Sequence, residues 1–302
     1  MSETLPQEKE PLPYNPLVME DEWRRGQVLP LAESIYEKSQ FEALPILADA
    51  LEEQGCTDSN ILSHLRNNTC PHHKGCWALG LVLGGDHELE SSIEVIRDQM
   101  LLYAKHFKRE LDLSTVELPE RTEEQEKEFT RLLIIDKKLA TEEAYQACKK
   151  QFPCYHYQEN KPLDQLIDPE QEERNPQTQG SYAIWVEDSQ NAPERNANLS
   201  ANQIKERKLQ TMTLRERLYD ELYHWDKNSS NPDQTQRHLD STNTYTHCSG
   251  SRHVGGHVPC VCWYSFPRKM FVLWSRPGDR DAALRARSVV SLPAKPSEAR
   301  VE

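Results

Sequence analysis

The sequence predicts an α+β protein, with an all-helical module in front and a module of a helix packed on an antiparallel sheet behind. Two observations support this prediction. Apolar residues recur at helical spacing up to about residue 110, whereas short β-branched and aromatic runs separated by Gly and Pro dominate after residue 180. With 302 residues the chain exceeds the usual size of one domain, so we expect two modest cores.

The front module is expected over residues 23–110, after a proline-rich, acidic stretch, residues 1–22, that predicts a disordered tail. In its first clear helix, Leu44, Leu47 and Leu51 belong to one apolar stripe. Gly55 predicts the end of that helix, and Thr57 or Asp58 can cap the next one. The helices expected in this module cover residues 41–54, 61–65, 77–83 and 91–107.

Residues 111–179 are expected to form a helical and disordered linker. Thr122 and Gln125 have the spacing of a capping box, which predicts a helix through the apolar run at 129–135. Thr141 predicts the start of a further helix that ends before Pro153. Residues 158–179 are rich in Gln, Glu, Asn and Pro, which predicts a mobile connection.

The back module is expected over residues 180–292, followed by a disordered tail at 293–302. Thr213 and Glu216 form a second capping-box pattern, which predicts a helix with Leu214, Leu218 and Leu222 on one face. The strands expected in this module cover residues 182–186, 243–248, 258–264, 270–274 and 288–292.

Charge and composition disfavour several classes of protein. The net charge of −13 argues against nucleic acid or an anionic membrane as the main partner. Neither a signal-peptide pattern nor a run of about 18 apolar residues is present, so a cytoplasmic location is expected. In that compartment the eight cysteines are expected to be reduced thiols or metal ligands.

One group of residues has the chemistry of a zinc site: Cys70, His72, His73 and Cys76 lie within seven residues. Thiolate and imidazole ligands on a tight loop suit tetrahedral zinc, although Cys-x5-Cys is not a common zinc spacing. We expect no cofactor from the sequence, with zinc at this group as the alternative. The alternative is that Cys76 is a small core residue beside Trp77, with both histidines exposed on a turn.

A second Cys/His group lies among the back strands. If residues 258–264 form a strand, Cys260 and Cys262 share one face and could bind the same ion, but they could equally be packed in a sheet core. The full group consists of His247, Cys248, His253, His257, Cys260 and Cys262.

An ordered series of short matches runs through the front module: residues 46–53, Gly55-Cys56, His64-Leu65-Arg66 and Gly75-Cys76-Trp77. Over about 40 residues it resembles a short helical module of large paralogous families in planctomycete-type bacteria. The resemblance implies no particular function. The chain departs from the family before His72, where residues 68–71 replace a Gly-Pro-rich turn.

The back half resembles an uncharacterised bacterial family through Thr213-Leu214-x-Glu216-Arg217-Leu218, His238-Leu239-Asp240 and Cys248-Ser-Gly-Ser-Arg252. Its last 50 residues, with a Trp-containing strand pair and Leu284-Arg285-x-Arg287-x-Val289-Val290, look like the end of a C-type-lectin-like domain, including versions diversified by retroelements. This resemblance implies a ligand surface between Cys260 and Arg280. The residues expected to bind a ligand there are Tyr264, Phe266, Arg268, Arg276 and Arg280.

Known catalytic motifs are missing from the sequence: it has no Gly-x-Ser-x-Gly, P-loop, dinucleotide fingerprint or His-Glu-x-x-His. We therefore expect a non-catalytic binding or protein-interaction protein whose partner, a protein or a small ligand, is not specified by the sequence. The alternative is a zinc-dependent structural or regulatory protein that uses one of the Cys/His groups.

Overall fold

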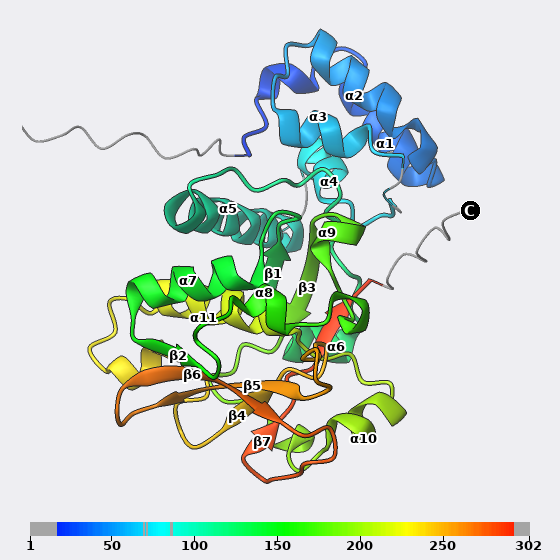
Figure 1. Cartoon of the computed structure of the whole chain (residues 1–302). Coiled ribbons are helices and arrows are strands. Elements are labelled where there is room, and N and C mark those ends of the chain that lie inside the picture. Colours follow the sequence, from blue (N-terminus) through cyan, green and yellow to red (C-terminus); the bar gives the residue numbers. More distant parts are fainter. Residues whose placement is uncertain (1–16, 69, 71, 85–86, 293–302) are drawn as a thin grey trace, which may run out of the picture.

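The α+β class is confirmed in the computed structural model, which describes residues 17–68, 70, 72–84 and 87–292. Helices dominate its first third and strands its last third (Figure 1). The described residues form two sheets, one of three strands and one of five. The expected tail at 293–302 lies outside the described residues.

The front of the chain is helical, as predicted. Gly55 ends the second helix with φ +91, and the Asp58 carboxylate caps the third by accepting hydrogen bonds from the backbone of Asn60 and Ile61. The helices of this region are α1 (Val28–Lys38), α2 (Leu44–Glu53), α3 (Ser59–Leu65), α4 (Trp77–Leu83) and α5 (His87–Phe107), with short 3-10 turns η1 (Asp21–Arg24) and η2 (Phe41–Ala43).

The expected N-terminal tail begins to be ordered earlier than predicted. Residues 1–16 lie outside the described part of the chain, but Leu17 is fully buried and its carbonyl accepts a hydrogen bond from Arg97 in α5. The acidic composition of residues 1–22 hid this contact, because composition does not show that Leu17 and Met19 pack against the core.

The three-stranded sheet lies at the centre of the molecule (Figure 1). It consists of β1 (Arg131–Ile135), β3 (Tyr182–Val186) and β8 (Val289–Ser291), antiparallel in the order β1-β3-β8. The predicted helix over 129–135 was wrong: the capping box at Thr122 is present, but it opens only α6 (Glu123–Glu128). All five residues of β1 are buried, and a short, uniformly apolar run has no periodicity that separates a strand from a helix.

The five-stranded sheet has the order β2-β6-β5-β4-β7 and lies at the bottom of Figure 1. Its β4, β5 and β6 are antiparallel neighbours, as expected, whereas β2 and β7 add parallel pairs at the two edges. The strands are β2 (Cys154–His156), β4 (Tyr245–His247), β5 (Val258–Tyr264), β6 (Lys269–Ser275) and β7 (Leu284–Arg285).

Residues 111–179 are not a linker in the structure. They supply β1 to one sheet and β2 to the other, and α7 (Thr141–Gln151) packs against α11 (Leu214–Lys227). Within 158–179, Leu163 is buried and the buried Arg174 forms an ion pair with Glu216. The prediction of a mobile connection was based on polar composition. Composition cannot show that a charged residue such as Arg174 is buried in an ion pair with a residue distant in the sequence. The remaining elements are α8 (Leu163–Leu166), α9 (Pro176–Gln179), α10 (Ala201–Glu206), η3 (Pro169–Gln171), η4 (Glu194–Asn196) and η5 (Gln234–Arg237).

A single cluster of buried apolar residues extends from Leu17 to Val290, so that the helices in front and the sheets behind share one core. None of the described helices combines the length and the apolar character needed to cross a lipid bilayer.

Candidate metal centre

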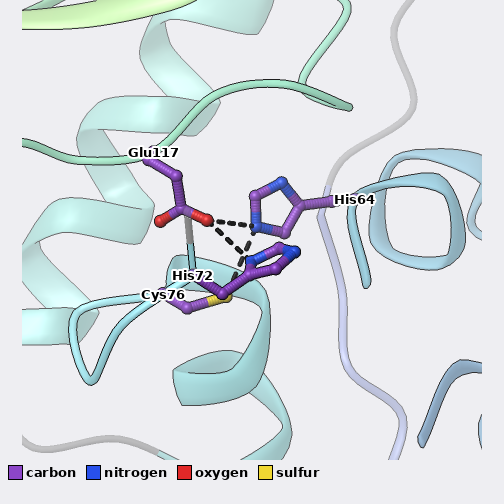
Figure 2. A group of neighbouring side chains, drawn as sticks. All are labelled: His64, His72, Cys76 and Glu117. Atoms are coloured by element: carbon purple, nitrogen blue, oxygen red, sulfur yellow. Dashed lines mark hydrogen bonds and ion pairs between the residues drawn. The ribbon is translucent and has the colours of Figure 1, made fainter. Parts of the chain in front are cut away.

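Four side chains with metal-binding atoms point toward one another between the front helices and an extended segment that follows α5. They are His64, His72, Cys76 and Glu117, and one ligand atom of each lies within 4.8 Å of the other three (Figure 2). His64 Nε2 lies 3.3 Å from Cys76 Sγ and 3.4 Å from Glu117 Oε1. His72 Nδ1 lies 2.7 Å from the same Glu117 oxygen.

The positions of the first three residues follow from the helical module. His64 is on the buried face of α3, and its ring packs against Trp77 at a centroid distance of 4.8 Å. Cys76 is the residue that precedes α4, and His72 lies on the loop between the two helices. The end of α3 and the start of α4 therefore determine the positions of the His72 imidazole and the Cys76 thiol.

Glu117 comes from an extended segment between α5 and α6 that the helical module binds through its backbone. Asn67 donates a hydrogen bond to Ser114 O at 2.7 Å, and Trp77 Nε1 donates to Val116 O at 3.0 Å. His64 Nδ1 donates to Leu113 O at 3.2 Å. These contacts place the Glu117 carboxylate over the loop, with its side chain fully buried.

The hydrogen bonds also determine which ring nitrogens are available to an ion. A backbone carbonyl can only accept, so His64 carries its proton on Nδ1, toward Leu113 O. His72 Nε2 lies 3.1 Å from Asn67 O and carries a proton for the same reason. In neutral rings, His64 Nε2 and His72 Nδ1 are then lone pairs directed at the carboxylate, the arrangement in which second-shell carbonyls orient metal-ligating histidines.

The electrostatics of the group reflect its burial. Burial raises the pKa of Glu117, but hydrogen bonds and charge interactions with His64 and His72 outweigh that effect and lower it to about 2. Burial, together with the negative charge of Glu117, raises the pKa of the Cys76 thiol. Glu117 Oε2 makes no hydrogen bond with the described residues, and the polar atom that faces it, His73 Nε2, lies 3.7 Å away.

Of the four ligands expected from the sequence, the structure places His72 and Cys76 in this group and the other two beside it. Cys70 Sγ lies 3.4 Å from Glu117 Oε1 and 3.6 Å from Thr115 O. His73 faces the second carboxylate oxygen, with Nε2 at 3.7 Å from Glu117 Oε2. The alternative of exposed histidines on a turn does not describe His72, whose side chain is 7% exposed.

Sequence reasoning missed His64 and Glu117. His64 stood in the module resemblance, and its position on the same helical face as Ile61 and Leu65 was a usable signal. Glu117 had none, because its segment carries no periodic pattern and reaches the loop through tertiary contacts.

The second Cys/His group does not form a metal site: within the described ranges, the group of four around Glu117 is the single cluster of this kind. Cys260 Sγ instead contacts Ser275 Oγ at 3.3 Å, and that hydroxyl lies 3.0 Å from His247 Nε2. Cys260 and Cys262 are both buried in the sheet, which agrees with the core-packing alternative.

The five residues expected to bind a ligand fall into two groups at opposite ends of β6. Phe266 and Arg268 lie at the exposed turn between β5 and β6, where Phe266 is 91% exposed. Arg276 and Arg280 lie beyond the other end, about 20 Å away for a strand of this length. Tyr264 forms a hydrogen bond with Tyr245 at 2.6 Å and packs on Phe271. A single surface that includes all five therefore does not form, and a role for each group stays a prediction.

The chain was also compared with known proteins: no family model, no curated protein and no solved structure matches it. The resemblances of the front and back halves accordingly stay predictions.

Proposed function

We propose that the protein is a non-catalytic, zinc-dependent structural or regulatory protein, with His64, His72, Cys76 and Glu117 as ligands. One observation carries the proposal. Two imidazole lone pairs, a carboxylate oxygen and a sulfur converge within 4.8 Å in a buried place, and backbone carbonyls orient both rings. Lone pairs that face a carboxylate repel it unless a cation or a proton lies between them.

The donor set and its spacing favour zinc over the common hard cations. Nitrogen and sulfur ligands select zinc, whereas calcium and magnesium require oxygen. Zinc bond lengths of about 2.0–2.3 Å place tetrahedral ligand atoms about 3.3–3.6 Å apart. The spacings of His64 Nε2 from Cys76 Sγ, 3.3 Å, and from Glu117 Oε1, 3.4 Å, are close to these edges. His72 Nδ1 and Glu117 Oε1, at 2.7 Å, would have to move apart to admit the ion.

A structural role follows from the coordination number and the burial. Four protein ligands complete a tetrahedron and leave no open position for substrate, which is the pattern of structural sites. The ion would connect α3, the loop before α4 and the segment that carries Glu117, and that segment continues into α6 and β1 of the central sheet. Zinc would thus crosslink the front helices to the rest of the core.

A proton can replace the ion, and this defines the competing hypothesis. If His72 is doubly protonated, its 2.7 Å contact with Glu117 is a charge-assisted hydrogen bond, and Cys76 donates its thiol proton to His64. The two hypotheses predict different numbers of bound ions. Zinc binding predicts one ion per chain and the release of protons, since zinc requires the thiolate, whereas the protonated cluster predicts no bound ion.

The test is metal analysis of protein purified without chelator, followed by cobalt(II) titration of the metal-free form. We expect one zinc per chain and a cobalt absorption spectrum typical of a tetrahedral site with a thiolate ligand. His64→Ala and Cys76→Ser should lose both. Cys56→Ser is the matched control, because Cys56 is buried in the same helical module but lies outside the group.

Absence of metal from the wild-type protein, together with failure to bind zinc at micromolar concentration near pH 7.5, would favour the protonated cluster. Binding that persists unchanged in both ligand variants would place the ion elsewhere.

A second candidate function, binding of a partner through the back half, is favoured by the exposure of Phe266. Because Tyr264 is held by Tyr245, the test is confined to the turn: Phe266→Ser with Arg268→Ser should leave the melting temperature unchanged and weaken binding. An identified partner that binds the double variant as tightly as the wild type would exclude this surface.

A further inference from the structure

A cleft of about 490 Å³ lies next to the metal centre, between the front helices and the central sheet. This volume is in the range of small-molecule sites, which often lie where two parts of a protein meet. One wall belongs to the helical module and includes Tyr36, His73, Lys74, Gly75, Gly80 and Leu83. The other wall includes Leu118, Pro119, Glu120, Arg121 and Trp185.

Each wall holds a cation over an aromatic ring. The Arg121 guanidinium lies 3.6 Å from the centroid of the Trp185 ring, and Lys74 Nζ lies 5.3 Å from that of Tyr36. Trp185 is fixed by its indole N–H, which donates to Pro119 O at 2.9 Å. Arg121 also donates to Phe129 O at 2.7 Å. Arg121 is therefore held in place by the fold, whereas Lys74 is exposed and lies beside the ring of Tyr36.

We propose that this cleft binds a small monoanionic molecule with a flat apolar body, such as an aromatic carboxylate. The anion would be recognised by Lys74 and Arg121 from opposite walls, and the body would lie against Leu83, Leu118 and the edge of Trp185. Within the described residues Lys74 forms no ion pair, so its charge is available to a ligand. A cationic ligand fits less well, because the chain's own cations already lie over both rings.

The acidic residues of the cleft limit the charge of the ligand. Glu120 and Glu126 also line it, and the Glu120 side chain is 76% exposed at its mouth. Two carboxylates near the entrance repel a multiply charged anion more strongly than a singly charged one. This is the reason for proposing a monoanion and not a polyphosphate.

The cleft is distinct from the metal centre, and His73 separates them. Its Nδ1 lies 3.0 Å from Gly75 N and 3.1 Å from Glu120 Oε1 on the side of the cleft, and its Nε2 faces Glu117 Oε2 at 3.7 Å. A ligand in the cleft would meet the other side of this ring without reaching the ligand atoms. The inference consequently does not depend on whether zinc is bound.

The experiment is calorimetric titration of the full chain with 2-naphthoate, with neutral 2-naphthalenemethanol and with a cationic naphthylmethylammonium salt, with and without zinc. We expect 2-naphthoate to bind with one site per chain and at least tenfold more tightly than the other two probes. Lys74→Gln should weaken it about tenfold, and Arg121→Gln by at least as much.

Lys150→Gln is the control, because Lys150 is an exposed lysine of α7 outside the cleft and its loss changes the net charge equally. Circular dichroism checks that each variant is folded, and Arg121→Lys keeps the charge if Arg121→Gln disturbs Trp185. Equal affinity for the anionic and the neutral probe would overturn the inference. So would an unchanged affinity in Lys74→Gln, or an effect of the same size in Lys150→Gln.

Discussion

Two buried carboxylates, Glu117 in the front half and Asp240 in the back half, have similarly lowered pKa values, although different side chains surround them. Burial raises the pKa of each, and their neighbours lower it to about 2 in both cases. Around Asp240 the neighbours are the guanidinium groups of Arg287 and Arg217, each with a contact of 3.0 Å. Around Glu117 they are the imidazoles of His64 and His72, with contacts of 3.4 Å and 2.7 Å.

The comparison shows when the negative charge of a buried carboxylate is compensated by the chain itself and when it requires a bound proton or cation. An arginine is charged at every physiological pH, and Asp240 also accepts hydrogen bonds from Thr246 and from the Ala192 backbone, so its site is complete. Imidazoles and thiols can be neutral, and Glu117 Oε2 has no hydrogen-bond partner among the described residues. The front site is balanced by protons or by a metal ion, and the back site by the fold itself.

The largest effect is expected from removing the centre of the complete site. Asp240→Ala leaves Arg217 and Arg287 buried without their shared partner, which should lower the free energy of unfolding by about 3–5 kcal/mol. Urea unfolding with and without zinc measures it, and the loss should be the same in both conditions. Glu37→Ala, at an exposed carboxylate of α1, is the control. A loss below about 1 kcal/mol would show that the ion pairs of Asp240 with Arg217 and Arg287 contribute little to the free energy of unfolding.

A second experiment asks how much of the front half depends on its apolar core. Leu47 is fully buried and its neighbour Ile46 is 61% exposed, which confirms the predicted stripe. Leu47→Ala should cost about 2–4 kcal/mol, whereas Ile46→Ala should cost less than about 0.5 kcal/mol. Equal costs for Leu47→Ala and Ile46→Ala in urea unfolding would contradict the burial of the stripe.

Glu172 is a third buried carboxylate, and in its case the neighbouring positive charge does not outweigh the effect of burial on the pKa. Burial raises its pKa to about 7, since Arg215 only partly offsets burial and the nearby charge of Glu216. The folded state then binds a proton that the unfolded chain, titrating near 4.5, releases, so the free energy of unfolding falls as pH rises between these values. Glu172→Gln should reduce the loss of stability between pH 5 and pH 8 by up to about 3 kcal/mol.

Urea unfolding of both proteins at the two pH values isolates Glu172, because all other titrating groups are shared. Parallel pH profiles for the wild type and the variant would contradict the raised pKa and would place Glu172 with the balanced carboxylates.

The sequence was informative where a signal is local. The boundaries of α2, α4, α7, α11 and the strand at 258–264 follow from apolar spacing, from glycine and from capping residues. It failed where the decisive partner is distant along the chain. The β1 run was assigned to a helix because its pairing with β3 is invisible locally, and 158–179 was assigned to a mobile connection because Arg174 meets Glu216 only in the fold.

The same division explains the candidate site. His72 and Cys76 were found because thiol and imidazole side chains lie close together on one short loop, which is a local pattern. Glu117 was missed because its approach to the loop depends on hydrogen bonds from Asn67 and Trp77 to a segment without periodicity. A helix cap, in contrast, is local in both sequence and structure, and two caps of this chain allow that to be measured.

The smallest effect is expected from the two capping boxes, at Thr122 and Thr213, which the sequence predicted and the structure contains. Thr213 begins α11, which carries Arg217, and the Glu216 carboxylate that accepts from Thr213 N also binds Arg174. Thr213→Ala should therefore cost about 1–2 kcal/mol, whereas Thr122→Ala, at an exposed six-residue helix, should cost about 0.5 kcal/mol. Thermal and urea unfolding of both variants measure the difference. Equal costs would mean that a cap stabilises its own helix alone. The ion pairs of Glu216 with Arg174 and of Arg217 with Asp240 would then not depend on the N-terminus of α11.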